Sequence, residues 1–127
     1  MTTKVIVIDS AQLPAGVEFP PLEVTKYGWE QYPQLDEKEI AERCWRADIL
    51  VSLSTAIRRP VLDKLNKLRL LIVAGEACNR LDQDAAQEHG VELLAFPDAN
   101  LRDVQAAQEL CGQVSAAISH YLRITDG

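Results

Sequence analysis

A short loop that follows an apolar run carries the residues with the most chemical potential. Gly75-Glu-Ala-Cys-Asn79 comes directly after Leu70-Leu-Ile-Val-Ala74, and a loop at the carboxyl end of a buried strand is the usual ligand position in open α/β sheets. Cys78 would be a nucleophile only if it were exposed and activated, and the sequence places no histidine next to it. Free cysteines are usually buried. The loop therefore favours binding over catalysis.

Two further groups of polar residues follow the apolar run that ends at Leu53. Ser54 and Thr55 would offer hydroxyl groups to the same cleft, although Ser and Thr at a strand-to-helix turn more often cap the next helix. Arg58 and Arg59 would attract a carboxylate, but an exposed pair at a helix entrance is usually just solvated. His89 precedes Gly90, so we expect it to interact with the last carbonyls of its own helix.

Composition and charge exclude several classes of function. The chain has 13 Lys and Arg against 19 Asp and Glu, a net charge of −6, which argues against nucleic acid or an anionic membrane as partner. Its three cysteines are widely spaced with no Cys-x-x-Cys pair, so neither a disulfide framework nor a structural zinc site is expected. The first apolar stretch, Val5 to Ile8, is too brief for a signal peptide. We expect a cytoplasmic protein.

The elements that must position these residues alternate along the chain. Apolar or alternating runs predict strands at 4–9, 22–27, 49–53, 70–74 and 91–96. Helices are expected from Asp36, with Glu39 completing a capping box, from Pro60, over 82–89, and over about 102–123. This order predicts a single three-layer α/β domain over 1–127, flavodoxin-like, with a mostly parallel five-stranded sheet in the order 2-1-3-4-5 and a long C-terminal helix.

The order and spacing of several short motifs match a known family. They are Ala47-Asp-Ile-Leu-Val-Ser-Leu-Ser-Thr-Ala-Ile-Arg-Arg-Pro-Val-Leu-Asp63, then Ala74-Gly-Glu-Ala-Cys-Asn-Arg-Leu-Asp82, His89-Gly-Val91 and Phe96-Pro97. Together they resemble the N-terminal, substrate-binding domain of the D-isomer 2-hydroxyacid dehydrogenases, most clearly from about Ala47 to Pro97. That resemblance implies a flavodoxin-like substrate domain, which in full enzymes faces an NAD-binding Rossmann domain across a cleft.

The resemblance also implies where a ligand would bind. In the family, backbone amides of the loop after the fourth strand hold the substrate carboxylate, so the implied substrate residues are Ser54, Thr55 and the loop from Gly75 through Glu76, Ala77 and Cys78 to Asn79. This chain departs from the family pattern at four places. Ala77 replaces a glycine, Glu76 brings a negative charge, Ala95 replaces an asparagine, and Asp103-Val-Gln-Ala106 replaces a cofactor-facing Ser-Val-Ala-Glu-like tetrad.

Two functions remain open at this point. The chain lacks a Gly-x-Gly-x-x-Gly motif, so no catalytic residue and no cofactor is expected in these residues, and NAD belongs to the full-length family. One reading is a stand-alone binding or interaction module that takes a small 2-oxo or 2-hydroxy acid. The other is the N-terminal part of an NAD-dependent D-2-hydroxyacid dehydrogenase of the glycerate or phosphoglycerate type. Coding sequence for a Gly-rich βαβ unit beyond Gly127 would favour the second.

The final helix carries more apolar residues than one sheet face should need. Its candidate interface residues are Val104, Ala107, Leu110, Cys111, Val114, Ile118 and Tyr121. A helix packed on a sheet needs an apolar stripe of roughly 100°, and these rows span more than that. Packing on its own sheet and a homodimer formed by pairing or exchanging this helix are both open, and we predict the homodimer.

Overall fold

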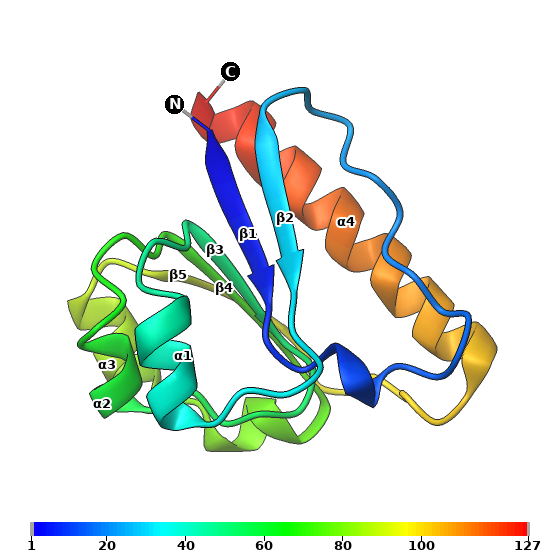
Figure 1. Ribbon diagram of the computed structural model, residues 1–127, viewed down its shortest axis with the longest axis horizontal. Helices are drawn as coiled ribbons and strands as arrows, with labels where there is room; N and C mark the ends of the chain where they lie inside the picture. Colours follow the sequence, from blue (N-terminus) through cyan, green and yellow to red (C-terminus); the bar gives the residue numbers. More distant parts are fainter. Residues whose placement is uncertain (1, 127) are drawn as a thin grey trace.

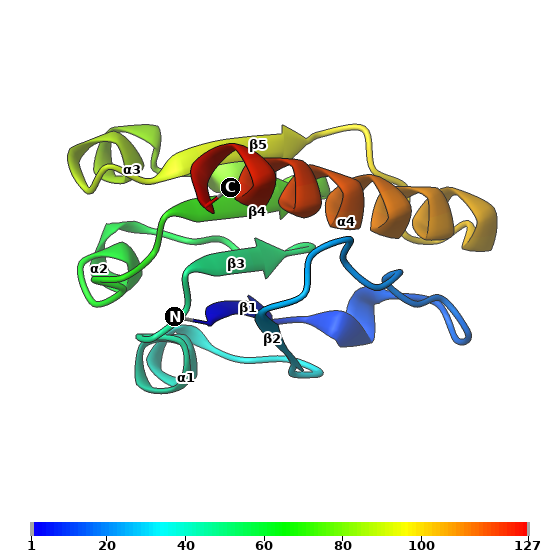
Figure 2. The same cartoon turned by 90° about the horizontal axis from the view of Figure 1, so that it is seen from above.

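Parallel strands form the centre of the molecule, as Figure 1 shows for the computed structural model, which describes residues 2–126. The strands are β1 (Thr3–Val7), β2 (Tyr27–Gln31), β3 (Ile49–Ser52), β4 (Leu70–Ala74) and β5 (Glu92–Phe96). Every pairing is parallel, and the order β2-β1-β3-β4-β5 can be followed in Figure 2. β1, β3 and β4 are almost entirely buried because their β-branched and leucine residues face helices on both sides. The predicted α/β fold and strand order are confirmed.

Helices cover the two faces of the sheet unequally. The short helices α1 (Glu37–Arg43), α2 (Arg59–Leu62) and α3 (Gln83–Glu88) lie on one face, and the long helix α4 (Val104–Asp126) lies on the other (Figure 1). Two 3-10 turns, η1 (Ser10–Gln12) and η2 (Gly75–Arg80), follow β1 and β4. The result is the three-layer arrangement that alternating strands and helices require.

Capping residues set the helix boundaries where the sequence predicts them. The Asp36 carboxylate accepts from the N–H of Glu39 at 2.8 Å while the Glu39 side chain accepts from the N–H of Asp36, which is the predicted capping box. Asp82 caps α3 through the N–H of Ala85. α1 ends at Arg43 with Cys44 as its C-cap residue, and Trp45 lies beyond the helix and is 46% exposed.

The strand predicted over 22–27 is wrong. β2 begins only at Tyr27, and residues 13–26, here called the strap, run alongside α4 instead. Four side chains of α4 fasten the strap. Gln108 bonds the N–H and carbonyl of Glu18, Ser115 donates to the Pro20 carbonyl, Ser119 accepts from the Glu23 N–H, and Arg123 pairs with the Glu23 carboxylate.

The strap explains the broad apolar face of α4. Leu110, Val114, Ile118 and Leu122 pack on the sheet, whereas Ala107 and Cys111 pack against Val17 of the strap. Of the seven residues proposed for a dimer interface, Ala107, Leu110, Cys111, Val114 and Ile118 are therefore buried within the subunit. Val104 is 56% exposed, and Tyr121 is half-buried beneath the Arg69 guanidinium. The homodimer itself stays a prediction.

Within residues 2–126, no helix combines the length and apolarity needed to cross a bilayer.

Candidate functional site

The carboxyl ends of the parallel strands gather four connecting segments at one edge of the sheet. Asp9 follows β1, Leu53 to Thr55 follow β3, η2 follows β4, and Pro97 to Asn100 follow β5. β1 and β3 are neighbours at the point where the strand order reverses. In open α/β sheets this is where ligands bind, so these segments form the candidate site.

The centre of this edge is occupied by a buried carboxylate of the protein itself. Asp9 is fully buried, and its Oδ1 accepts from the N–H of Leu53 at 2.8 Å. Its Oδ2 accepts from the N–H groups of Ser54 and Thr55 at 2.9 and 3.1 Å and from the Thr55 hydroxyl at 2.8 Å. Successive backbone N–H groups in a turn form an anion-binding concavity. Here the anion is supplied by the chain, a contact that sequence reasoning missed.

This contact changes the interpretation of Ser54 and Thr55. The favoured interpretation, helix capping, is wrong, because Arg58 is the N-cap residue of α2 and no side-chain bond caps that helix. Both residues are half-buried and face Asp9. Their proposed contact with a substrate stays a prediction, and the Thr55 hydroxyl would have to be shared with Asp9.

The loop after β4 is a 3-10 helix rather than an open turn. Gly75 takes φ +58, the left-handed conformation that its position requires. Ala77, which stands at the second glycine of the family loop, keeps a negative φ and is fully buried in the core. Glu76 and Asn79 are exposed. The loop thus places the Glu76 carboxylate at the edge of the sheet where, in the family, the carboxylate of the substrate would bind.

Cys78 lacks the environment of a reactive thiol. It is half-buried, its Sγ lies 3.6 Å from the Val73 carbonyl, and burial raises the pKa of the thiol. Burial also raises the pKa of Cys44 to about 12 and that of Cys111 to about 11. Since the thiolate is the nucleophile and the metal ligand, all three cysteines stay protonated near neutral pH. Residues 2–126 contain no cluster of acids, cysteines and histidines that would hold a metal.

Two arginines beside η2, Arg58 and Arg59, have acidic partners. Arg58 pairs with Glu37 at 3.0 Å, and Arg59 pairs with Glu88 and lies 3.8 Å from Asp82. Both arginines border an open hollow of about 690 Å³ that also includes Asn79 and Arg80. Arg58 and Arg59 are therefore ion-paired on the surface and not simply solvated, as the sequence suggested. His89 is the C-cap residue of α3, and its backbone N–H donates to the Ala85 carbonyl at 3.1 Å, so the predicted interaction with its own helix carbonyls is present. Its ring makes a different contact, with Nε2 lying 2.7 Å from the Asp63 carboxylate.

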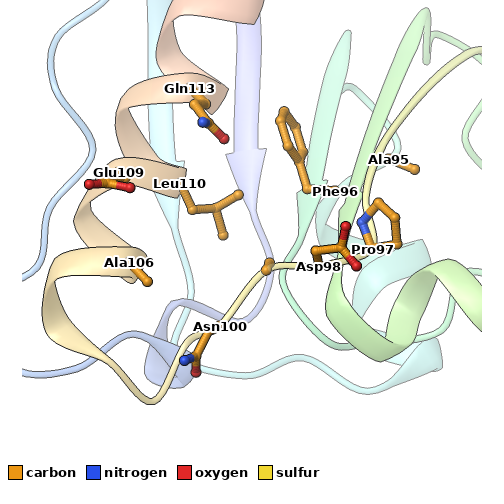
Figure 3. A pocket seen from close by; sticks show the side chains of 10 residues that line it. Ala95, Phe96, Pro97, Asp98, Asn100, Ala106, Glu109, Leu110 and Gln113 are labelled. Carbon is orange, nitrogen blue, oxygen red and sulfur yellow. The ribbon is translucent and has the colours of Figure 1, made fainter.

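A second hollow lies between the segment after β5 and α4. It has a volume of about 320 Å³, and Figure 3 shows its lining, with Phe96 and Asp98 on one side and Leu110 and Gln113 of α4 on the other. Glu109 and Asp98 are its charged residues, and its lining contains no cation. The Asp103 carboxylate, in the segment that replaces the cofactor-facing tetrad, accepts from the N–H of Ala106 at 2.9 Å and so caps α4. This lining suits neither the phosphates of a dinucleotide nor a free acid.

Comparison with known sequences identifies one family. Residues 6–108 match the family described as D-isomer specific 2-hydroxyacid dehydrogenase, catalytic domain. A protein of Haemophilus influenzae named as a 2-hydroxyacid dehydrogenase is 27% identical over 88 residues, 69% of this chain and 28% of that protein. The D-3-phosphoglycerate dehydrogenase of Methanocaldococcus jannaschii is 33% identical over 84 residues, 65% of this chain and 16% of the enzyme. The chain thus spans less than a third of these relatives.

A solved structure agrees on the fold. The NAD⁺-bound 3-phosphoglycerate dehydrogenase of Entamoeba histolytica superposes with a TM-score of 0.60 at 17% identity, covering 75% of this chain and 33% of the enzyme. At this level of identity the likeness concerns the fold alone.

Proposed function

The chain belongs to the D-isomer specific 2-hydroxyacid dehydrogenase family, and we propose that its 127 residues act as a substrate-side binding module that performs no hydride transfer by itself. Hydride transfer requires a nicotinamide held against the substrate carbon, a cation that binds the acid, and a proton donor such as a histidine paired with a carboxylate. The module supplies the sheet edge that receives the ligand. A cytoplasmic location is part of the same proposal.

One observation carries the proposal: no glycine-rich phosphate cradle can be assembled from these residues. The six glycines stand far apart, at positions 16, 28, 75, 90, 112 and 127, whereas a dinucleotide cradle needs three glycines within one turn so that the backbone can approach the pyrophosphate. The acidic hollow beside β5 adds to this, because Asp98 and Glu109 would repel phosphate. NAD does not fit the residues present.

The acid-binding position in this proposal is the loop formed by η2. The backbone amide of the exposed Glu76 would receive a small 2-oxo or 2-hydroxy acid, with Ser54 or Thr55 as secondary contacts. The neighbouring Ala77 amide, which is fully buried in this structure, would join it only if η2 opens. Binding is expected to be weak, since the exposed Glu76 carboxylate stands beside the ligand. Like charges about 4 Å apart repel by roughly 1 kcal/mol in water.

The second candidate is the N-terminal part of an NAD-dependent D-2-hydroxyacid dehydrogenase of the glycerate or phosphoglycerate type. Its support is the partial coverage of the longer relatives, one of which is named D-3-phosphoglycerate dehydrogenase. In that case NAD would be held by a Rossmann domain outside these residues. A reading frame that continues into a Gly-rich βαβ unit would favour this candidate over the module.

Titration of the purified 127 residues tests the proposal. NADH at millimolar concentration should give no saturable heat by calorimetry, and pyruvate should not be reduced. Pyruvate or glycerate should shift the NMR signals of the Glu76 and Ala77 amides, and Glu76→Thr should strengthen that binding a few-fold by removing the like charge. Glu42→Thr on α1, which removes an equal charge elsewhere, should leave it unchanged. Saturable NADH binding, or shifts on another face, would overturn the proposal.

A further inference from the structure

A small hollow lies on the other side of α4, between the strap and β2. Its lining, here called the aromatic hollow, consists of Val17, Glu18, Phe19, Pro20, Pro21, Trp29 and Gln31. Its volume is about 280 Å³, just under the roughly 300–1,000 Å³ of drug-sized ligand pockets. Neither the family's loop nor the proposed acid site includes these residues. Any ligand here must be small.

Two half-exposed aromatic rings form the apolar part of this lining. Phe19 and Trp29 have ring centroids 5.3 Å apart and ring planes tilted by 54°. The indole N–H of Trp29 donates to Gln31 Oε1 at 2.7 Å. Because this bond satisfies the one polar group of the indole, the ring is held in place and offers a ligand its carbon surface.

The strap side of the hollow is held rigidly before any ligand arrives. Gln108 of α4 accepts from the N–H of Glu18 at 3.2 Å and donates to its carbonyl at 2.7 Å. Ser115 fixes the Pro20 carbonyl at 2.8 Å, and the ring of the adjacent Pro21 restricts the backbone further. A preformed site loses little conformational entropy on binding.

The charge of the lining selects a cation. Aromatic faces carry the negative part of the ring quadrupole, Glu18 is exposed and acidic, and the lining contains no lysine or arginine. A primary ammonium would have to exchange its water for three hydrogen-bond acceptors. The side-chain acceptors of the lining are the exposed Glu18 carboxylate and Gln31 Oε1, which Trp29 already engages through one lone pair. A quaternary ammonium, in contrast, has no N–H group to satisfy. We propose that the aromatic hollow binds the quaternary ammonium group of a small cationic compound.

Fluorescence titration with choline tests this proposal. The chain has two tryptophans, so Trp45→Phe leaves Trp29 as the single reporter without touching the hollow. Choline should change the Trp29 emission saturably, whereas its uncharged isostere 3,3-dimethyl-1-butanol should bind at least about tenfold more weakly, since only the charge differs. Glycine betaine should bind more weakly than choline because its carboxylate meets Glu18. Equal binding of choline and the isostere would overturn the proposal.

Variants locate the binding, with amide NMR shifts as the readout. Trp29→Leu keeps an apolar side chain but removes the ring, and should reduce choline binding about tenfold or more. Trp29→Phe keeps an aromatic ring and should lose less choline affinity than Trp29→Leu. It also serves as a control in case Trp29→Leu fails to fold. Glu18→Gln should weaken choline but not the isostere. Unchanged choline binding in both Trp29→Phe and Glu18→Gln would overturn the proposal. The proposal would also be overturned if the protein sedimented with phosphatidylcholine vesicles but did not bind free choline.

Discussion

Asp9 is the residue on which the ligand edge of the sheet depends most. Its carboxylate joins the end of β1 to the turn after β3 through bonds from Leu53, Ser54 and Thr55, with no exposed surface of its own. A buried charge is tolerated only where hydrogen bonds replace its lost water. The amides that cradle Asp9 are of the kind that would otherwise hold a ligand anion, so the central position of this edge already contains an anion.

Replacing this carboxylate should destabilise the fold. Asp9→Asn puts an amide NH₂ where an oxygen accepts bonds, so donors on the turn after β3 lose their partner. Each buried donor without a partner costs roughly 1–3 kcal/mol, and we expect the free energy of unfolding to fall by about 3 kcal/mol in urea denaturation. Asp98→Asn, the same change at an exposed position, should be nearly neutral. Equal midpoints for the two variants would contradict this role.

At the scale of elements, glycine substitutions should separate backbone strain from helix propensity. Gly90 ends α3 with φ +70, while Gly112 lies inside α4 with an ordinary φ, and a Cβ at either position meets nothing within 4 Å. Gly90→Ala should therefore destabilise the protein by about 1–2 kcal/mol through strain in the left-handed conformation. Gly112→Ala should stabilise it by about 0.5–1 kcal/mol. Thermal unfolding measures both, and shifts of the same sign would contradict the argument.

Elements that have a strong local signal could be predicted from the sequence. β4 matches its predicted range, and the capping box at Asp36 fixes α1, because both depend on neighbours in the chain. The strap could not be predicted in the same way. The alternation from Leu22 to Tyr27 suits an edge strand, but Ser119 and Arg123 of α4, distant in sequence, bind Glu23 and hold this region on the helix.

The candidate site shows the same limit. Its location after β4 follows from the strand pattern and the family resemblance. The 3-10 conformation of η2, the burial of Ala77 and the bonds of Thr55 to Asp9 all depend on tertiary contacts between separate strands. No periodicity within one element reports such contacts.

At the scale of the whole molecule, the apolar excess of α4 is covered by the chain's own strap. The sheet takes Val114 and Ile118, and the strap takes Ala107 and Cys111. A second copy can reach these residues only if α4 leaves its sheet and packs on that of the partner. The homodimer, as a proposal, therefore requires exchange of α4 about the connection between β5 and this helix.

Charged substitutions on α4 distinguish a dimer that exchanges this helix from a dimer that pairs through the surface of the helix. Val114→Glu with Ile118→Glu should give an unfolded or insoluble chain, because burying Val or Ile contributes roughly 1.5–3 kcal/mol each and both side chains are fully buried. Ala116→Glu, at an exposed position of the same helix, should leave folding and assembly unchanged. Analytical ultracentrifugation of the unmodified chain decides whether the dimer forms. If the unmodified chain is a monomer at the highest concentrations, the dimer is ruled out. If the unmodified chain is a dimer and the double variant is a folded, soluble monomer, the two copies pair through the surface of α4 without exchanging it.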